Sequence, residues 1–326
     1  MLNLERELKQ VSSAAIAGHV RPDGDCVGSC MGLYLYIKKN FPQISRLDVY
    51  LEEIPEAMGF LKDTDQIKHA VREEEPYDLF LALDCGDSGR LGEAEGCFKQ
   101  AKRTICIDHH ISNTGYADEN YIVPEASSTS ELVYDLLDPE KLTREMAEAL
   151  YMGIAHDTGV FQYSCCSPKT METAGKLMAM GIDFTGIVDR TFYQKSYLQL
   201  QILGRALLES MMLFDGRCIV SVIRNREMKF YNVGPADLDG IVSQLRNTKG
   251  VEVAIFIYET NVQEYKVSMR SNSFVDVSRV AAYFGGGGHV RAAGCTMHGS
   301  PYDVLNNLTK QIEKQFLQQS EQEKQQ

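Results

Sequence analysis

The chain has 326 residues, 44% of them hydrophobic, and a formal net charge of −12, so its length predicts two domains with globular cores. The negative charge argues against a long, sequence-independent grip on a nucleic-acid backbone, but it allows a small phosphorylated substrate held by metal ions or a local basic pocket. The sequence has no run of about 18 apolar residues and no signal peptide, which predicts a cytoplasmic protein without membrane contact. Its nine cysteines include no CxxC pair, which predicts reduced thiols.

From the start to about residue 110, short β-rich segments alternate with helical ones, a pattern typical of βαβ units and a parallel sheet. Strands are expected at 14–20, 47–52, 77–84 and 103–108. Helical stretches are expected between them, at 26–40, 55–62 and 92–101. The first domain is therefore expected to be an α/β domain with a mainly parallel sheet and helices on both faces.

After residue 125 the pattern is mainly helical, with Ser128 three residues before Glu131 as in a capping box and a later helix ended by Gly181. A second, smaller α/β domain follows, with strands at 216–224, 251–259 and 264–271 and a helix at 235–248. The expected divisions are a first domain at 1–182, a helical connector at 183–209, a second domain at 210–316 and a disordered polar tail at 317–326.

Acidic and imidazole side chains follow three of the expected strands. His19, Asp23 and Asp25 follow the first strand, Asp84 the third, and Asp108, His109 and His110 the fourth, while Asp157 ends an apolar helix. In an open parallel sheet, ligands bind beyond the carboxyl ends of the strands, so these side chains are expected to meet. Each motif alone is more often a turn or a core feature; their joint placement favours a site.

Several carboxylates can share one place only if cations offset their repulsion. The number of candidate ligands exceeds what one octahedral metal ion can hold if it must also bind a substrate. The candidates are His19, Asp23, Asp25, Asp84, His109 and Asp157. This set therefore predicts two divalent metal ions that share one carboxylate. Oxygen and imidazole ligands without thiolate favour Mn²⁺, with Mg²⁺ and Fe²⁺ as alternatives.

Other polar and sulfur-bearing residues near these motifs have simpler interpretations. Asp87 is expected to be a turn or cap residue, His69 and His298 to lie at the surface, and Cys26 and Cys85 to serve packing; the role of His156 stays open.

A second cluster, "FGGGGHVRAAG", lies in the expected second domain. Its glycines offer free backbone N–H groups for an anion-binding nest, and His289 adds a donor. Upstream, Arg270 and Ser271 end a strand and are expected to form a phosphate fork if the cluster binds phosphate. A flexible loop and a phosphate site are about equally good interpretations of this cluster.

Taken together, the motifs resemble those of the DHH phosphoesterase superfamily. H-x-x-P-D-x-D at His19–Asp25, D-x-x-D at Asp84–Asp87, "DHH" at 108–110, "HDTG" at 156–159 and "GGGGH" at 285–289 occur in the family's order. The sequence is similar to the two-domain branch with a DHH-associated C-terminal domain. More narrowly it resembles the NrnA-type group of oligoribonucleases and 3′-phosphoadenosine-5′-phosphate phosphatases.

The resemblance implies a role for each motif. One metal ion would be held by His19, Asp23 and Asp84, and the other by Asp25, Asp84, His109 and Asp157, with Asp84 shared. His110 would face the scissile phosphate, supported by Asp108, so that His110 and Asp84 are the catalytic residues. The far end of the substrate would be held by Arg270, Ser271, Gly286, Gly287, Gly288 and His289.

The resemblance thus implies hydrolysis of short oligoribonucleotides to nucleoside monophosphates, or of 3′-phosphoadenosine-5′-phosphate (PAP) to AMP and phosphate. Short RNA or small nucleotides, not long nucleic acid, are the expected partners; a homodimer is one oligomeric state left open. The main alternative is a phosphodiesterase for cyclic dinucleotides or their linear forms, although many such proteins carry sensory or membrane segments that this sequence lacks. The glycine cluster argues against a related pyrophosphatase, and the intact ligand set against a non-catalytic nucleotide-binding module.

Overall fold

The computed structural model describes residues 2–71 and 75–323 and divides the chain into two compact units, Met1–Gln194 and Lys195–Gln326. The division falls inside the helical segment expected at 183–209, which contains α7 (Phe184–Val188), the π-helix η5 (Asp189–Tyr193) and α8 (Tyr197–Leu208). In the part of the chain that is described, no helix is both long and apolar enough to cross a membrane.

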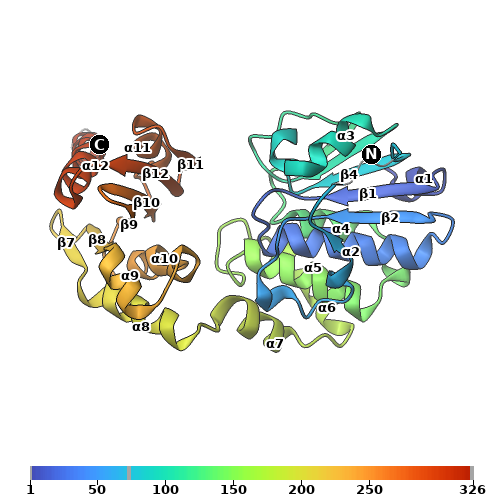
Figure 1. Ribbon diagram of the computed structural model, residues 1–326, viewed down its shortest axis with the longest axis horizontal. Helices are drawn as coiled ribbons and strands as arrows, with labels where there is room; N and C mark the ends of the chain where they lie inside the picture. The colour runs from blue at the N-terminus through green and yellow to red at the C-terminus, as the bar shows by residue number, and fades with distance from the viewer. Residues whose placement is uncertain (1, 72–74, 324–326) are drawn as a thin grey trace. The chain divides into compact units, whose positions relative to one another are not determined.

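The first unit is built on a parallel sheet with strand order β3-β2-β1-β4-β5-β6 (Figure 1). Within the described residues its strands are β1 (Ser13–Ala17), β2 (Arg46–Tyr50), β3 (Ile67–Lys68), β4 (Leu79–Leu83), β5 (Thr104–Asp108) and β6 (Glu119–Ile122). All the residues of the central strands β4 and β5 are buried, as expected for strands covered on both faces.

Helices cover both faces of this sheet, as the sequence predicts (Figure 1). The helices are α1 (Leu4–Leu8), α2 (Gly24–Asn40), α3 (Glu95–Gln100), α4 (Thr129–Leu136), α5 (Arg144–Asp157), α6 (Pro168–Ala179) and α7. Alternate residues of one strand divide between the faces: Ile16 packs in the core beneath α2, α4 and α5, whereas Ala15 and Ala17 face the opposite side with Phe98 of α3.

The strand order places a topological switch point between β1 and β4. From β1 the chain proceeds outward to β2 and β3, and then crosses back to β4 before continuing to β5 and β6. The connections that leave β1 and β4 therefore diverge to opposite halves of the sheet, which opens a crevice at the carboxyl ends of these strands. His19 and Asp84 both lie at this crevice.

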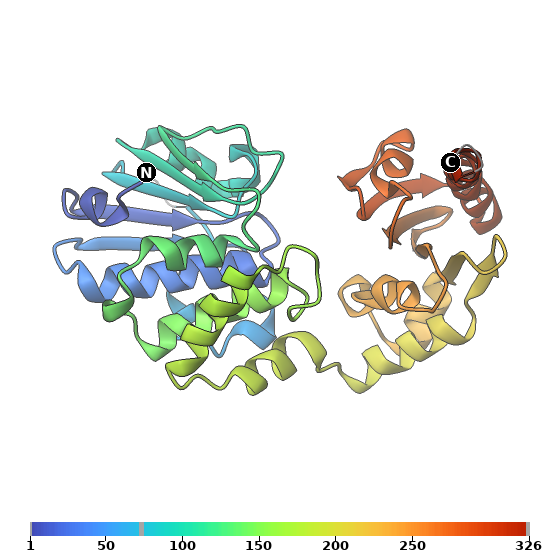
Figure 2. The same ribbon diagram turned by 180° about the vertical axis from the view of Figure 1, so that it is seen from behind.

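The second unit contains a mixed sheet of order β11-β12-β10-β9-β8-β7, in which the pair β8–β9 is parallel and the other pairs are antiparallel. Its described strands are β7 (Met211–Leu213), β8 (Cys218–Ile223), β9 (Val253–Asn261), β10 (Glu264–Ser271), β11 (Gly287–His289) and β12 (Ala292–His298). Its helices are α8, α9 (Asn225–Tyr231), α10 (Ile241–Arg246), α11 (Val277–Tyr283) and α12 (Pro301–Glu323). α11 and α12 pack on one face and α8 to α10 on the other (Figure 2).

Several local expectations differ from the structure. The helix expected at 235–248 is divided at Gly240 into a 3-10 turn, η6 (Pro235–Leu238), and α10. Residues 55–62 form only a 3-10 turn, η1 (Glu56–Met58), because Pro55 and Gly59 bound the segment. The edge strands β3 and β6 are too short to give a clear β pattern. The expected disordered tail is helical at 317–323, where it forms the last part of α12. Ile312 and Phe316 of this helix pack on the sheet just before that segment. Residues 324–326 lie outside the described part. Finally, Gly287–His289 form a strand rather than an open loop.

Helices α2 and α5 cross closely at Gly28. A β-carbon at this position would lie 2.5 Å from the carbonyl oxygen of Ala149 and 2.9 Å from the backbone nitrogen of Gly153. Both atoms belong to the backbone of α5 and cannot move aside as a side chain does. The close approach therefore requires glycine, despite the helix propensity that glycine sacrifices.

We expect Gly28→Ala to lower the free energy of unfolding by about 1–3 kcal/mol, the usual cost of overpacking. Gly96→Ala in α3 is the matched control, because its β-carbon would meet no atom within 4 Å. Chemical denaturation of both variants measures the difference. Equal stabilities of the two variants would contradict the close crossing.

Candidate metal centre

The loop after β1 brings His19 and Asp23 to the switch point. The Nδ1 atom of His19 lies 2.9 Å from the carbonyl oxygen of Val20, which leaves Nε2 as the ligand atom. That Nε2 lies 3.6 Å from a carboxylate oxygen of Asp23 and 3.6 Å from one of Asp84. The other Asp23 oxygen accepts from the backbone N–H groups of Asp25 and Cys26 and so caps α2.

Asp84 occupies the centre of the cluster. Its Oδ2 faces His19, and its Oδ1 lies 3.6 Å from Nε2 of His109. The side chain is almost fully buried, and its backbone has φ = 52°, in the left-handed region that non-glycine residues rarely adopt. Strained backbone of this kind is typical of functional sites, and here it turns the carboxylate toward two imidazoles at once.

A second group of ligand atoms lies on the far side of Asp84. His109 Nε2 is 3.0 Å from Oδ2 of Asp157, at the end of α5, and 4.0 Å from Oδ2 of Asp25, in the first turn of α2. Asp25, His109 and Asp157 each offer one ligand atom within 4.8 Å of the others. Five separate elements thus bring all six sequence-predicted ligand residues together.

His110 is held by a buried carboxylate. Its Nδ1 lies 2.7 Å from Oδ1 of Asp108, whose other oxygen accepts a 2.7 Å hydrogen bond from the side-chain amide of Asn113. The hydrogen bond to Asp108 raises the pKa of His110. This orients His110 beside Asp84, 3.7 Å from its Oδ1, and identifies Asn113 as a supporting residue that the sequence analysis missed.

The N-terminus of α4 holds two of the carboxylates. Asp25 accepts hydrogen bonds from the backbone N–H groups of Thr129 (2.7 Å) and Ser130 (2.9 Å). The hydroxyl of Thr129 donates to Oδ1 of Asp84 at 3.1 Å. Thr129 therefore touches both acidic residues, and the only signal for it in the sequence is the N-cap Ser128, which accepts from Glu131 N–H as expected.

The electrostatics of the cluster fit a cation. Burial and the charges of Asp84 and Asp157 raise the pKa of Asp25 well above its usual value, and burial with Asp84 raises that of Asp157 to about 6. Burial lowers the pKa of His109, but the surrounding carboxylates outweigh it and raise the value to about 10. The acidic groups thus repel one another and draw protons onto the imidazoles, so divalent cations bound by the same oxygen and imidazole atoms would relieve both effects.

Cys26 does not change this donor set. Its sulfur lies close to His19 and Asp84, but burial and Cys30 raise the pKa of the thiol well above its usual value. A protonated thiol is a poor metal ligand, so packing remains the simpler role. All nine cysteines are free.

The structure also places the remaining residues singled out in the sequence. The Nε2 atom of His156 is hydrogen-bonded to the Thr191 hydroxyl at 2.9 Å. The ring of His156 occupies the space that a β-carbon at position 24 would need, so Gly24 packs directly against it. Asp87 precedes the 3-10 segment η3 (Ser88–Ala94) without a side-chain capping bond. His69 and His298 are exposed, as expected.

Within the second unit, the predicted substrate residues lie on adjacent strands. Arg270 of β10 and His289 of β11 pair with opposite sides of Ala292 on β12. Ser271 is buried, and its hydroxyl donates to the Val290 carbonyl at 3.4 Å, which ties the end of β10 to the β11–β12 turn.

The expected nest of four free glycine N–H groups is wrong in part. The N–H groups of Gly285 and Gly286 donate to the carbonyls of Ala282 and Ala281, at 3.0 and 2.9 Å. A β-carbon at Gly286 would lie 2.2 Å from the Gly294 carbonyl oxygen. Close packing against β12 therefore accounts for this glycine.

Comparison with known proteins identifies the family. The DHH family N-terminal domain matches residues 13–154, and the DHHA1 domain matches residues 215–318. A bifunctional oligoribonuclease and PAP phosphatase NrnA of Thermus thermophilus is 30% identical, over 88% of this chain and 85% of that protein. The chain belongs to the DHH family.

Other DHH proteins show the same full-length similarity. A bifunctional oligoribonuclease and PAP phosphatase NrnA of Bacillus subtilis is 25% identical over 95% of this chain and 96% of that protein. The crystal structure of an exopolyphosphatase-related protein from Bacteroides fragilis has a TM-score of 0.88 at 25% identity, covering 95% of this chain and 94% of that one. The likeness therefore includes both domains.

We expect Thr129→Val in this DHH protein to weaken Mn²⁺ binding by about tenfold, the lower end of the effect of removing a residue that orients a metal ligand. The reason is that Asp84 would lose its hydroxyl donor while the backbone contact to Asp25 remains. Thr129→Ser, which keeps the hydroxyl, is the control. Isothermal titration calorimetry measures the affinity, and identical affinities of the valine variant and the wild type would contradict the assignment.

Proposed function

We propose that this protein is a metal-dependent phosphoesterase that hydrolyses short oligoribonucleotides to nucleoside monophosphates and PAP to AMP and phosphate. The observation that carries the proposal is the convergence of two imidazoles and three further carboxylates around Asp84 at the switch point of the sheet. Full-length similarity to relatives named bifunctional oligoribonuclease and PAP phosphatase supports the substrate class.

Two divalent cations, with Mn²⁺ favoured by the oxygen and imidazole donors, are part of this proposal. His19, Asp23 and Asp84 would hold one of them. Asp25, His109 and Asp157 would hold the other together with Asp84, which is central enough to serve both. When bound, such ions supply Lewis-acid activation of water and neutralise charge on the phosphate.

The side chains around the centre have distinct tasks. Asp108 and Asn113 orient His110, which stabilises the charge that develops on the phosphate oxygens. In the second unit, Arg270, Gly287, Gly288 and His289 bind the far end of the nucleotide. Ser271 and Gly286, assigned to the same site from the sequence, hold this segment against the neighbouring strands. The pairing of Arg270 and His289 beside the same residue of β12 supports their joint use, because a planar guanidinium and an imidazole both donate to phosphate.

The first test is hydrolysis by the purified protein with Mn²⁺ of a diribonucleotide, a 24-mer RNA, PAP and cyclic di-AMP. We expect turnover of the diribonucleotide and PAP, little turnover of the 24-mer, and complete loss on chelation of the metal. Asp84→Ala should abolish activity and reduce bound Mn²⁺, since one residue serves both ions.

Two results of this test would contradict the proposal. Preference for cyclic di-AMP would move the same centre to a signalling nucleotide. Near-normal activity of Asp84→Ala would remove the shared-ligand assignment.

His110→Ala should lower kcat by about 100-fold, within the range for loss of one group that stabilises the transition state. Mn²⁺ content should not change, because His110 lies outside the proposed ligand set. Kinetics with PAP and metal analysis by mass spectrometry measure the two quantities. Loss of metal together with activity would instead make His110 a ligand.

A further inference from the structure

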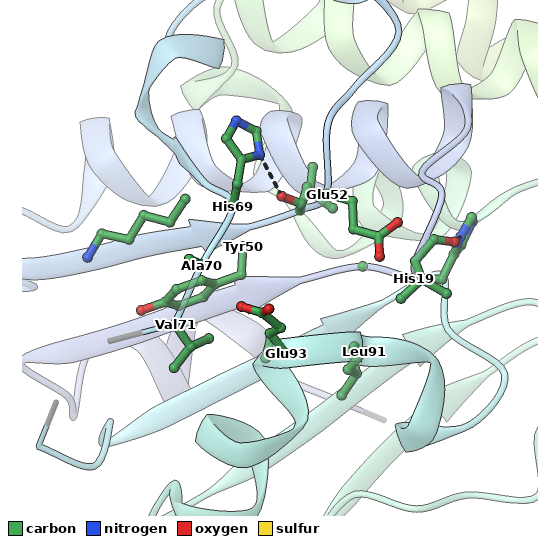
Figure 3. A pocket seen from close by; sticks show the side chains of 14 residues that line it. His19, Tyr50, Glu52, His69, Ala70, Val71, Leu91 and Glu93 are labelled. Atoms are coloured by element: carbon green, nitrogen blue, oxygen red, sulfur yellow. Dashed lines mark hydrogen bonds between the residues drawn. The ribbon is translucent and has the colours of Figure 1, made fainter. Parts of the chain in front are cut away.

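A cavity of about 130 Å³ lies in the first unit beside His19 (Figure 3). Its walls come from the carboxyl ends of β1, β2 and β3 and from the 3-10 segment η3. The lining residues include Gly18, Tyr50, Glu52, Ala70, Leu91 and Glu93. Since His19 belongs to both the cavity wall and the metal centre, whatever occupies the cavity lies next to the first proposed metal ligand.

The lining suits an uncharged polar group rather than a phosphate. Figure 3 shows the carboxylate of Glu52 on the side of the cavity near His19 and the carboxylate of Glu93 on the side near Tyr50. The His69 ring is instead turned toward the Leu51 carbonyl, which it contacts at 2.9 Å. Lys68, the cationic lining residue, is 2.8 Å from Asp48. One Glu52 oxygen accepts from the Arg21 N–H at 2.7 Å, so the side chain is held in place. Carboxylates repel phosphate but accept hydrogen bonds from ribose hydroxyls and exocyclic amines.

The two reactions of the proposed function differ by one group. In both, the water oxygen forms a bond to phosphorus, the bond from phosphorus to the 3′ oxygen of the first nucleotide breaks, and that oxygen leaves as a hydroxyl with a proton from water. The phosphate that is attacked carries a second nucleoside in a dinucleotide and nothing further in PAP. A site for that downstream nucleoside would therefore act on one substrate only.

We propose that the cavity beside His19 binds the downstream nucleoside of the oligonucleotide substrate. This inference rests on the proposed function and deepens it, because it assigns a separate subsite to the diester reaction. The apolar parts of Ala70 and Leu91 contact the nucleoside, and Glu52 and Glu93 accept its hydrogen bonds. The same two carboxylates oppose a further phosphate beyond it, which favours substrates of very few nucleotides.

The test compares three substrates that share the first nucleotide: 5′-phosphorylated diadenylate, PAP, and PAP carrying a methyl ester on the 3′-phosphate. Ala70→Trp fills the cavity, since Ala70 is exposed on its wall. Glu93→Gln removes one carboxylate without adding bulk. Ala57→Trp, at an exposed position in η1 outside the cavity lining, is the matched control for a surface tryptophan.

For the wild type, we expect the diadenylate to have a lower KM than the methyl diester, because only the former has a downstream nucleoside. Ala70→Trp should reduce the ratio of kcat/KM for diadenylate to kcat/KM for PAP by about tenfold, comparable to the loss of one hydrogen bond to a charged group. It should also bring the KM values of the diadenylate and the methyl diester together. Glu93→Gln should change the same ratio in the same direction, and Ala57→Trp should leave it as in the wild type.

The outcomes separate this inference from the proposed function. In one outcome, the wild type hydrolyses diadenylate and PAP while Ala70→Trp lowers both rates equally or changes neither of them. In that case the cavity does not bind the downstream nucleoside, but the proposed phosphoesterase function is retained. If the wild type hydrolyses none of the three substrates, the proposed function itself fails. Circular dichroism and thermal unfolding of each variant show whether a loss of activity comes from misfolding. If Ala70→Trp is misfolded, the activity ratio of Glu93→Gln alone decides whether the cavity binds the downstream nucleoside.

Discussion

The mutual repulsion of buried carboxylates is the constraint on which the first unit depends. Asp25 and Asp84 are buried almost completely. Burial raises the pKa of Asp25, and the charges of Asp84 and Asp157 raise it further. Such a group is tolerated only with partners that offset the charge. The N-terminus of α4, the imidazoles and the Thr129 hydroxyl provide part of that compensation, and the donor geometry leaves the rest to cations.

This constraint explains several local features that would otherwise be costly. The left-handed backbone of Asp84 directs its carboxylate between His19 and His109. The close approach of α5 to α2 at Gly28 aligns the helix that carries Asp157 with the one that carries Asp25. Both features make the backbone less stable by themselves, and both place a side chain of the candidate metal centre in position.

The alternation of strands and helices and the strand-end motifs are sufficient to predict the parallel sheet and the identity of the clustered residues. Polar residues after separate strands can be related in this way because all parallel strands end at one edge. Thr129 and Asn113 could not be predicted from the sequence, since each acts through one hydrogen bond across more than one element. The role of the glycine cluster could be predicted only in part, because backbone packing and backbone anion binding require the same residue. The hydrogen bonds from the Gly285 and Gly286 N–H groups to α11 show packing for these two glycines.

The proposed ligand residues span His19 to Asp157 and come from five elements, so no short fragment of the chain contains the candidate metal centre. A metal ion at this centre therefore binds the folded state and has little affinity for the unfolded one. By mass action, the binding free energy then adds to the stability of the first unit. The concentration of free metal would consequently set how long the protein survives proteolysis, as well as how fast it works, and metal starvation would lower its abundance.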